Sequence, residues 1–246
     1  NYAACFVFAT LAGGTIATKQ PAMTGHAFSR ALAADSPNRE TAWALFRRVL
    51  SSQTVSLIGN VVAVAFVTIA LWFAVLSPND IDVKPDYHIA KNTFDVSTLW
   101  YATVAGAWLS FAGLMSGYFS NLLVYHRIAA RIQVRGLNFA KVQKIAPKLF
   151  GSIVLGFLLG GTGAIGALTG IPVDIRHVAF SSAQVTLGMI ANREIATTAL
   201  LGVAAIGLVN LIVSFSLTWW VSRLQLRADR SRIRIEIDQE RATRIP

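Results

Sequence analysis

Long apolar runs separated by polar stretches constrain this chain more than any other feature of its sequence. The hydrocarbon core of a bilayer is about 30 Å thick, so a helix needs roughly 20 apolar residues to cross it. Only 14% of the 246 residues are charged, whereas a soluble domain has about 25%. Five apolar runs are long enough or nearly so, at residues 2–18, 54–76, 99–125, 150–168 and 195–221. The pattern predicts an all-α fold, a polytopic transmembrane helix bundle with about five spans.

A sixth apolar stretch, from Val178 to Ala191, differs from the other five. It has 14 residues and carries several hydroxyl and amide side chains, and Arg176-His177 and Arg193-Glu194 flank it. Such a segment is too short and too polar to cross a bilayer alone. We therefore expect an interfacial or re-entrant helix at 178–191.

The basic residues alternate between the two sides of the predicted bilayer. Eighteen lie in the first and third loops and in the tail after the last span, and only four lie in the other two loops. Because cytoplasmic loops carry the excess of Lys and Arg, we expect a multi-pass protein of the bacterial inner membrane with a cytoplasmic C-terminus. The chain starts with Asn1 in an apolar run, and we interpret this start as a cut end rather than a signal peptide.

Two cytoplasmic loops have the features of basic helices. Ser36-Pro37 is a typical helix start, which predicts a helix through residues 42–46. In the third loop, arginines recur every four residues, as on one face of an amphipathic helix. We expect these basic residues to bind anionic lipid headgroups, with docking of a protein partner as the alternative and nucleic acid as an unfavoured partner. The set comprises Arg127, Arg131, Arg135, Lys141, Lys144 and Lys148.

The division predicted from the sequence is a transmembrane helical domain at 1–222 and a basic cytoplasmic tail at 223–246. Residues 232–238 of the tail alternate between apolar and charged side chains, which favours a strand. The same residues contain the pairs Arg232/Glu236 and Arg234/Asp238, whose spacing of four favours a helix. The sequence leaves both structures open.

Glycines recur along the fourth run. Gly156, Gly160, Gly166 and Gly170 would let a neighbouring helix approach closely, which is how small residues drive packing in lipid. The alternative is a flexible helix that lines a substrate path. We favour helix packing.

A polar cluster follows this run and includes Asp174, Arg176, His177, Ser181 and Ser182. The Asp and Arg could pair, and the His could carry a proton near neutral pH. The more conservative interpretation is a polar hairpin that holds the short helix at the membrane surface. Within the spans, Asn60, Asn121 and Asn210 are expected to form interhelical hydrogen bonds.

The sequence contains no motif for a metal, a phosphate or a nucleotide. The single cysteine, Cys5, cannot form an intrachain disulfide. We therefore predict no metal site and no cofactor.

Four blocks occur together in this chain: Ile16–Thr24, Gly59–Ala63, Gly117–Arg127 and Gly170–Ser182. Together they resemble the C-terminal membrane half of a bacterial family known as site-specific recombinases. The resemblance implies a longer protein with a mostly soluble N-terminal half. It also implies DNA strand exchange, but it identifies no catalytic residue in this sequence.

Three functions remain open. The first is a noncatalytic membrane scaffold that docks lipid and either a protein partner or further copies of itself. The second is a transporter or channel component that uses the glycine-rich helix and hairpin at 156–177. The third is a membrane-tethered recombinase, as the family label says. We favour the scaffold, because no span carries a charged residue near its middle and the polar cluster is predicted to lie outside the cytoplasm.

Overall fold

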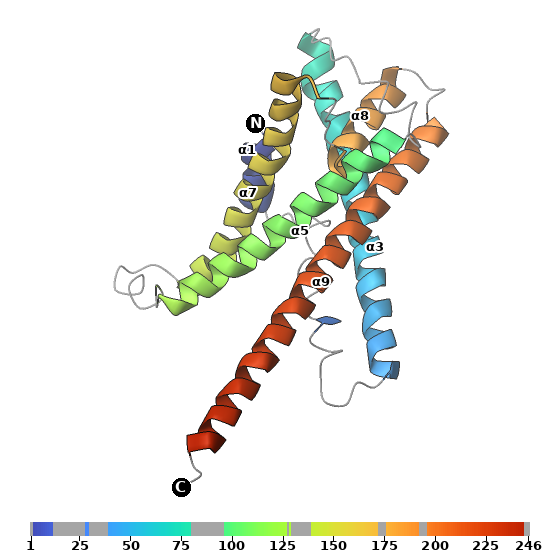
Figure 1. The fold of residues 1–246 in the computed structure, drawn as a ribbon. Coiled ribbons are helices and arrows are strands. Elements are labelled where there is room, and N and C mark those ends of the chain that lie inside the picture. Colours follow the sequence, from blue (N-terminus) through green and yellow to red (C-terminus); the bar gives the residue numbers. More distant parts are fainter. Residues whose placement is uncertain are drawn as a thin grey trace.

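The structure of the protein is a computed structural model that describes residues 2–11, 28–29, 39–79, 96–126, 128, 139–171, 176–191 and 196–243. These residues are almost entirely helical and include no strand (Figure 1). The described α-helices are α1 (Tyr2–Leu11), α3 (Arg39–Leu71), α5 (Val96–Tyr125), α7 (Phe139–Thr169), α8 (Val178–Ala191) and α9 (Ala196–Thr243). The π-helical turn Trp72–Leu76 and the 3-10 turn Ser77–Asn79 extend α3. The predicted all-α fold is confirmed.

Four of the described helices are long and apolar enough to cross a membrane, and α8 is a shorter apolar helix. The four stretches are Trp43–Asn79, Val96–Tyr125, Val142–Thr169 and Ala199–Ala228. They contain nearly all of the second to fifth predicted runs. The first predicted run, 2–18, is described only as far as Leu11, and residues 12–18 lie outside the described residues.

The helices α3 and α7 begin earlier than the apolar runs that predicted them. α3 begins at Arg39, so that the helix expected through 42–46 and the run 54–76 form one helix; the expected start at Ser36-Pro37 lies outside the described residues. α7 begins at Phe139 rather than near residue 150. Backbone hydrogen bonds continue through polar residues, whereas hydropathy marks only the part of a helix that suits lipid.

Successive long helices run in opposite directions (Figure 1). We call the end where α3 and α7 finish, at Asn79 and Thr169, the distal end; α5 and α9 begin there. The opposite end carries exposed basic side chains, and we call it the basic end. Its described basic residues are Arg47, Arg48, Lys144, Lys148, Arg223 and Arg227.

Small and hydroxyl residues line the contact between α5 and α9. On α5 they recur every four residues, and α9 faces them with a similar series. A Cβ at Gly106 would come within 2.9 Å of the Val213 Cβ, so the helices are close here. The hydroxyls of Ser110 and Thr218 share a hydrogen bond of 2.8 Å. The buried series are Thr98, Ala102, Gly106 and Ser110 on α5 and Asn210, Ser214, Thr218 and Ser222 on α9. Packing of this kind holds helices together in lipid.

A second close contact joins α1 to α7. Thr10 on α1 shares a hydrogen bond of 2.8 Å with Ser152 on α7. Phe6 of α1 packs into an apolar cluster with Leu109 of α5 and Leu155 of α7. α1, α5 and α7 therefore form one packed group.

α8 packs against α3 and α9. Val178 and Val185 form an apolar cluster with Ala199 and Val203 of α9, and Leu57 of α3 packs against it. α8 has 14 residues, which is about 21 Å of helix and less than the thickness of a bilayer core. Its first residue lies beside Asn210, whereas its C-terminal turn lies near the start of α9 at the distal end (Figure 1). α8 therefore begins deep in the bundle and returns to the distal end.

The tail is helical. α9 runs without a break from Ala196 to Thr243 and crosses the expected domain boundary between residues 222 and 223. The strand expected as one alternative for 232–238 is wrong, because no strand occurs in the described part of the chain and these residues belong to α9. A lone strand would have no partner for its backbone groups, whereas a helix pairs them within the segment.

Candidate functional site at the buried start of α8

The segment between α7 and α8 begins at a glycine in the left-handed region. Gly170 has a φ of +68°, a conformation that commonly ends helices and that other residues adopt only with strain. A Cβ here would meet no atom within 4 Å. Gly170, which the sequence grouped with the packing glycines, therefore ends α7 and does not touch another helix.

Asn210 connects this segment to two long helices. Its side-chain oxygen accepts a hydrogen bond of 3.3 Å from the Val178 N–H, which is the first N–H group of α8. Its amide nitrogen donates to the carbonyls of Ala102, at 2.7 Å, and Arg176, at 3.3 Å. The first N–H groups of a helix have no partner within the helix and need one when they are buried. Asn210 supplies that partner from α9.

His177 caps the same helix. Its Nδ1 accepts a hydrogen bond of 3.3 Å from the Ala179 N–H, and its carbonyl accepts one of 3.0 Å from the Ser181 N–H. Its ring meets the rings of Phe6 and Phe180 edge-on, with centroids 5.9 and 5.8 Å away, and only 1% of the residue is exposed. An Nδ1 that accepts a hydrogen bond carries no proton, so this geometry fits a neutral imidazole.

The two serines are buried. Ser181 is 1% exposed and Ser182 is 3% exposed. The hydroxyl of Ser182 donates to the Val178 carbonyl at 2.7 Å, and the hydroxyl of Ser181 has no hydrogen-bond partner in the described part of the chain. Arg176 is also buried, and Asp174 lies outside the described residues. The structure thus places four of the five cluster residues inside the bundle, where the sequence predicted a hairpin at the membrane surface.

No pattern in the sequence indicates this burial. Polar side chains usually prefer water, so a polar cluster between two apolar runs suggests a surface turn. The bonds from Asn210 and the side-chain cap of His177 remove much of the cost of burying these backbone groups. Asn210 was expected only to form an interhelical hydrogen bond, and no sequence pattern indicates that it binds the start of α8.

The other predicted site residues are distributed over the bundle. Gly156 faces α1, where a Cβ would overlap the backbone of Ala3. Gly166 is buried on α7 and Gly160 is half-buried. Lys144 and Lys148 are exposed at the basic end, whereas the positions Arg127, Arg131 and Arg135 and the side chain of Lys141 lie outside what the structure describes. Among the described residues, no group of three His, Cys, Asp or Glu residues could hold a metal ion.

A family model described as "Site-specific recombinase" matches residues 1–240. The chain belongs to this family. No curated protein and no solved structure matches the chain.

The candidate site does not resemble a centre for the chemistry in the family's name. DNA strand exchange requires a nucleophile that can reach a phosphate, with cationic groups that stabilise the phosphoryl charge. Ser181 and Ser182 lie beside Arg176 and His177 in sequence, but all four residues are buried. In this member of the site-specific recombinase family, DNA cannot reach this cluster without opening the bundle.

Proposed function

We propose that this protein is a noncatalytic scaffold of the bacterial inner membrane that docks anionic lipid and a protein partner at its basic end. The observation that carries the proposal is the contrast between its two polar regions. The described part of the cluster at the start of α8 is buried, and its His177 and Ser182 side chains bond to the backbone of α8. The basic side chains at the ends of α3, α7 and α9 are exposed. Exposed, charged residues are the ones available to a partner.

The proposed orientation follows from these charges. The basic end faces the cytoplasm, as the positive-inside rule requires. The C-terminus is then cytoplasmic and the distal end faces the periplasm. In this orientation the segment that contains α8 is re-entrant: Gly170 lies on the periplasmic side, Val178 lies beside Asn210, and α8 returns to the periplasmic side.

α9 supplies the docking surface. It has 48 residues, or about 72 Å of helix, roughly twice what a bilayer core requires. A helix turns by about 100° per residue. Viewed along the axis of α9, five arginine positions therefore lie within a sector of about 60°. These positions are Arg223, Arg227, Arg230, Arg234 and Arg241. A row of arginines that continues beyond the headgroups matches carboxylates or phosphates on a partner. Arg223 also lies 4.8 Å from the ring of Trp219, a residue type that suits the headgroup region.

The first experiment tests orientation with single cysteines in a Cys5→Ser background. Thr169→Cys reports on the distal end and Lys148→Cys, on the same helix, reports on the basic end. In intact inner-membrane spheroplasts, an impermeant maleimide should label Thr169→Cys alone. Inverted vesicles should label Lys148→Cys alone. The reverse pattern would overturn the proposed orientation and would place the basic end outside the cytoplasm.

The second experiment tests docking in cells with a photocrosslinking amino acid at Arg227 or, as the matched control, at Thr169. We expect a discrete protein adduct only from position 227, and the double variant Arg223→Glu/Arg230→Glu should remove it. Ser182→Ala should leave the adduct unchanged, because its hydroxyl only bonds to its own helix. An adduct that survives the double variant would contradict docking through the arginines.

A third experiment addresses the recombinase alternative. The full chain in nanodiscs should neither cleave nor relax supercoiled plasmid DNA, with or without Ser181→Ala and Ser182→Ala. Covalent attachment of DNA to the wild-type chain that either serine variant abolishes would refute the noncatalytic scaffold.

A further inference from the structure

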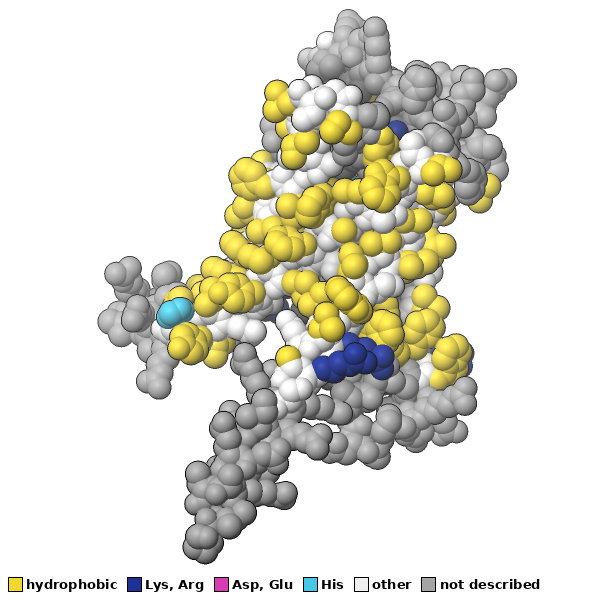
Figure 2. Space-filling model, viewed as in Figure 1, with side chains coloured by type: hydrophobic (Ala, Val, Ile, Leu, Met, Phe, Trp, Pro, Cys, Tyr) yellow, Lys and Arg dark blue, Asp and Glu magenta, His cyan; other side chains and the backbone are white. Residues whose placement is uncertain are grey.

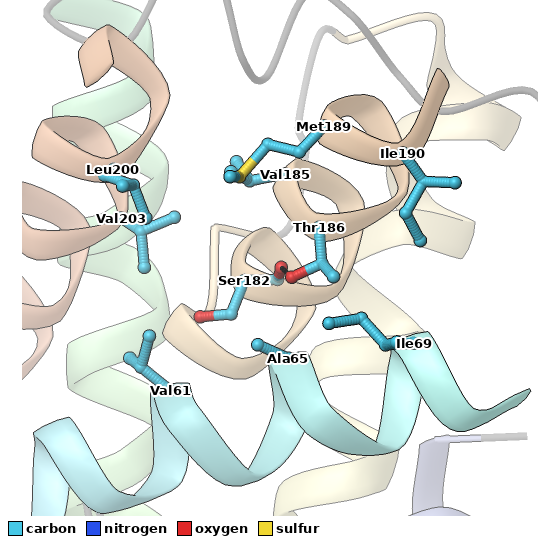
Figure 3. A pocket seen from close by; sticks show the side chains of 10 residues that line it. All are labelled: Val61, Ala65, Ile69, Ser182, Val185, Thr186, Met189, Ile190, Leu200 and Val203. Carbon is cyan, nitrogen blue, oxygen red and sulfur yellow. Dashed lines mark hydrogen bonds between the residues drawn. The ribbon is translucent and has the colours of Figure 1, made fainter. Parts of the chain in front are cut away.

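A cavity of about 260 Å³ lies between α3, α8 and α9. In Figure 3, side chains from the three helices point towards one empty space. Three lining residues come from α3, five from α8 and two from α9. Ala65 of α3 and Val185 of α8 lie on facing sides. This cavity shares only Ser182 with the candidate site and is separate from the basic end.

The lining is apolar. None of its ten residues is charged, and only Ser182 and Thr186 have polar side chains. Both hydroxyls donate to carbonyls of α8 itself, Ser182 to Val178 at 2.7 Å and Thr186 to Ser182 at 2.8 Å. A buried water needs two to four polar partners, and a dry apolar cavity of about 150 Å³ already binds benzene. The lining therefore suits a hydrocarbon better than water.

The cavity is continuous with the outer surface of the bundle. Ile69 at its edge is 41% exposed and Leu200 is 49% exposed. None of the most apolar stretch of α3 is buried, and Figure 2 shows hydrophobic side chains spread over the middle of one face of the molecule. In a membrane this surface contacts lipid tails, so an occupant enters the cavity sideways from the bilayer.

The dimensions of the cavity indicate which kind of molecule it can hold. The lining extends along α8 from Ser182 to Ile190, a rise of about 12 Å. A helix segment about 12 Å long and, with side chains, about 10 Å wide occupies roughly 900 Å³, well above the cavity volume of about 260 Å³. The cavity therefore suits one hydrocarbon chain better than a helix of a second copy.

We propose that this cavity binds one acyl chain of a membrane phospholipid from the leaflet at the distal end. The end of α8 near Ile190 is also the end near which α9 begins, so the headgroup would remain in the distal headgroup layer while the chain inserts towards Ser182. The site is independent of the proposed docking function. A bound acyl chain gives α8, which is too short to cross the bilayer, an apolar contact on the side that α3 and α9 do not cover.

The test uses the full chain in nanodiscs that contain a phospholipid with a diazirine in its acyl chain. After irradiation, mass spectrometry should find the adducts concentrated on α8 peptides and on Val61 to Ile69 of α3. Ala65→Leu, which fills the cavity, should lower labelling of α8 about tenfold, because burying roughly two fewer methylene groups already weakens binding by this factor.

Two further variants make the result specific. Ile69→Trp covers the edge from outside and should reduce α8 labelling without changing the core. Ala63→Leu, on the exposed side of the same helix, is the matched control and should leave labelling unchanged. Equal labelling of all exposed apolar residues, with no effect of Ala65→Leu or Ile69→Trp, would mean ordinary lipid contact and would overturn the proposal.

Discussion

At the scale of single residues, Asn210 joins three segments that are far apart in the sequence. It is fully buried on α9, it accepts from the first N–H of α8, and it donates to carbonyls of α5 and of Arg176. Hydrogen bonds between membrane helices usually contribute modestly, since alternative partners exist in the unfolded state. Asn210 differs because its loss removes the acceptor of the buried Val178 N–H at the start of α8.

Asn210→Leu should therefore lower the free energy of unfolding by about 1–2 kcal/mol. Asn121→Leu, at an exposed position of α5, is the matched control and should have little effect. The free energy of unfolding of both variants can be measured in mixed micelles, with tryptophan fluorescence as the signal. Equal stability of the two variants would show that the Asn210 bonds do not hold α8.

At the scale of helices, close approach depends on which glycine faces which neighbour. Gly156 lies against the backbone of α1, whereas a Cβ at Gly161 would meet no atom within 4 Å. The two positions are about 1.4 turns apart on α7, and the sequence around them is similarly rich in glycine. Only the packing of α1 distinguishes them.

Gly156→Ala should separate α1 from α7 and lower the free energy of unfolding by about 1–3 kcal/mol, as overpacking does. Gly161→Ala should be neutral or slightly stabilising, because alanine favours helix over glycine. Hydrogen exchange of α1 is the measurement: it should rise in Gly156→Ala alone. An unchanged α1 in both variants would contradict the close contact.

The continuity of α9 also belongs to the helix scale. With spin labels at Ala228→Cys and Ala242→Cys, a continuous helix predicts about 21 Å between the labelled backbone positions, and a strand over residues 232–238 lengthens this to roughly 32 Å. Pulsed electron resonance in nanodiscs resolves these two distances. We expect the shorter one, and a distribution centred near the longer one would contradict a helical tail.

At the scale of the whole molecule, apolar side chains lie outside as well as inside. Phe66 on α3 is 73% exposed, which water would disfavour and lipid would not. Trp108 on α5 instead packs against the core and donates to Thr162 at 2.9 Å. The molecule is therefore arranged for an apolar solvent around its middle.

Single-tryptophan variants should reveal this arrangement. With all other tryptophans replaced by Phe, the fluorescence of Phe66→Trp should be strongly quenched by lipids brominated on their acyl chains. A protein that retains only Trp108 should be quenched less, since neighbouring helices cover part of that ring. Similar weak quenching of both would argue that α3 does not face lipid.

Sequence alone determined the helical class, the positions of most apolar helices and the short helix at 178–191. Hydropathy is summed over residues that are neighbours in the sequence, and the thickness of the bilayer sets the length of the apolar run that a span needs. Only the tertiary structure decided that α3 and α9 continue beyond their apolar parts, that Gly156 and not Gly161 faces a neighbour, and that His177, Ser181 and Ser182 are buried. These outcomes depend on partners distant in sequence, such as Ala3 and Asn210. Sequence-based reasoning predicts that a polar side chain is exposed unless the distant residue that hydrogen-bonds to its segment is known.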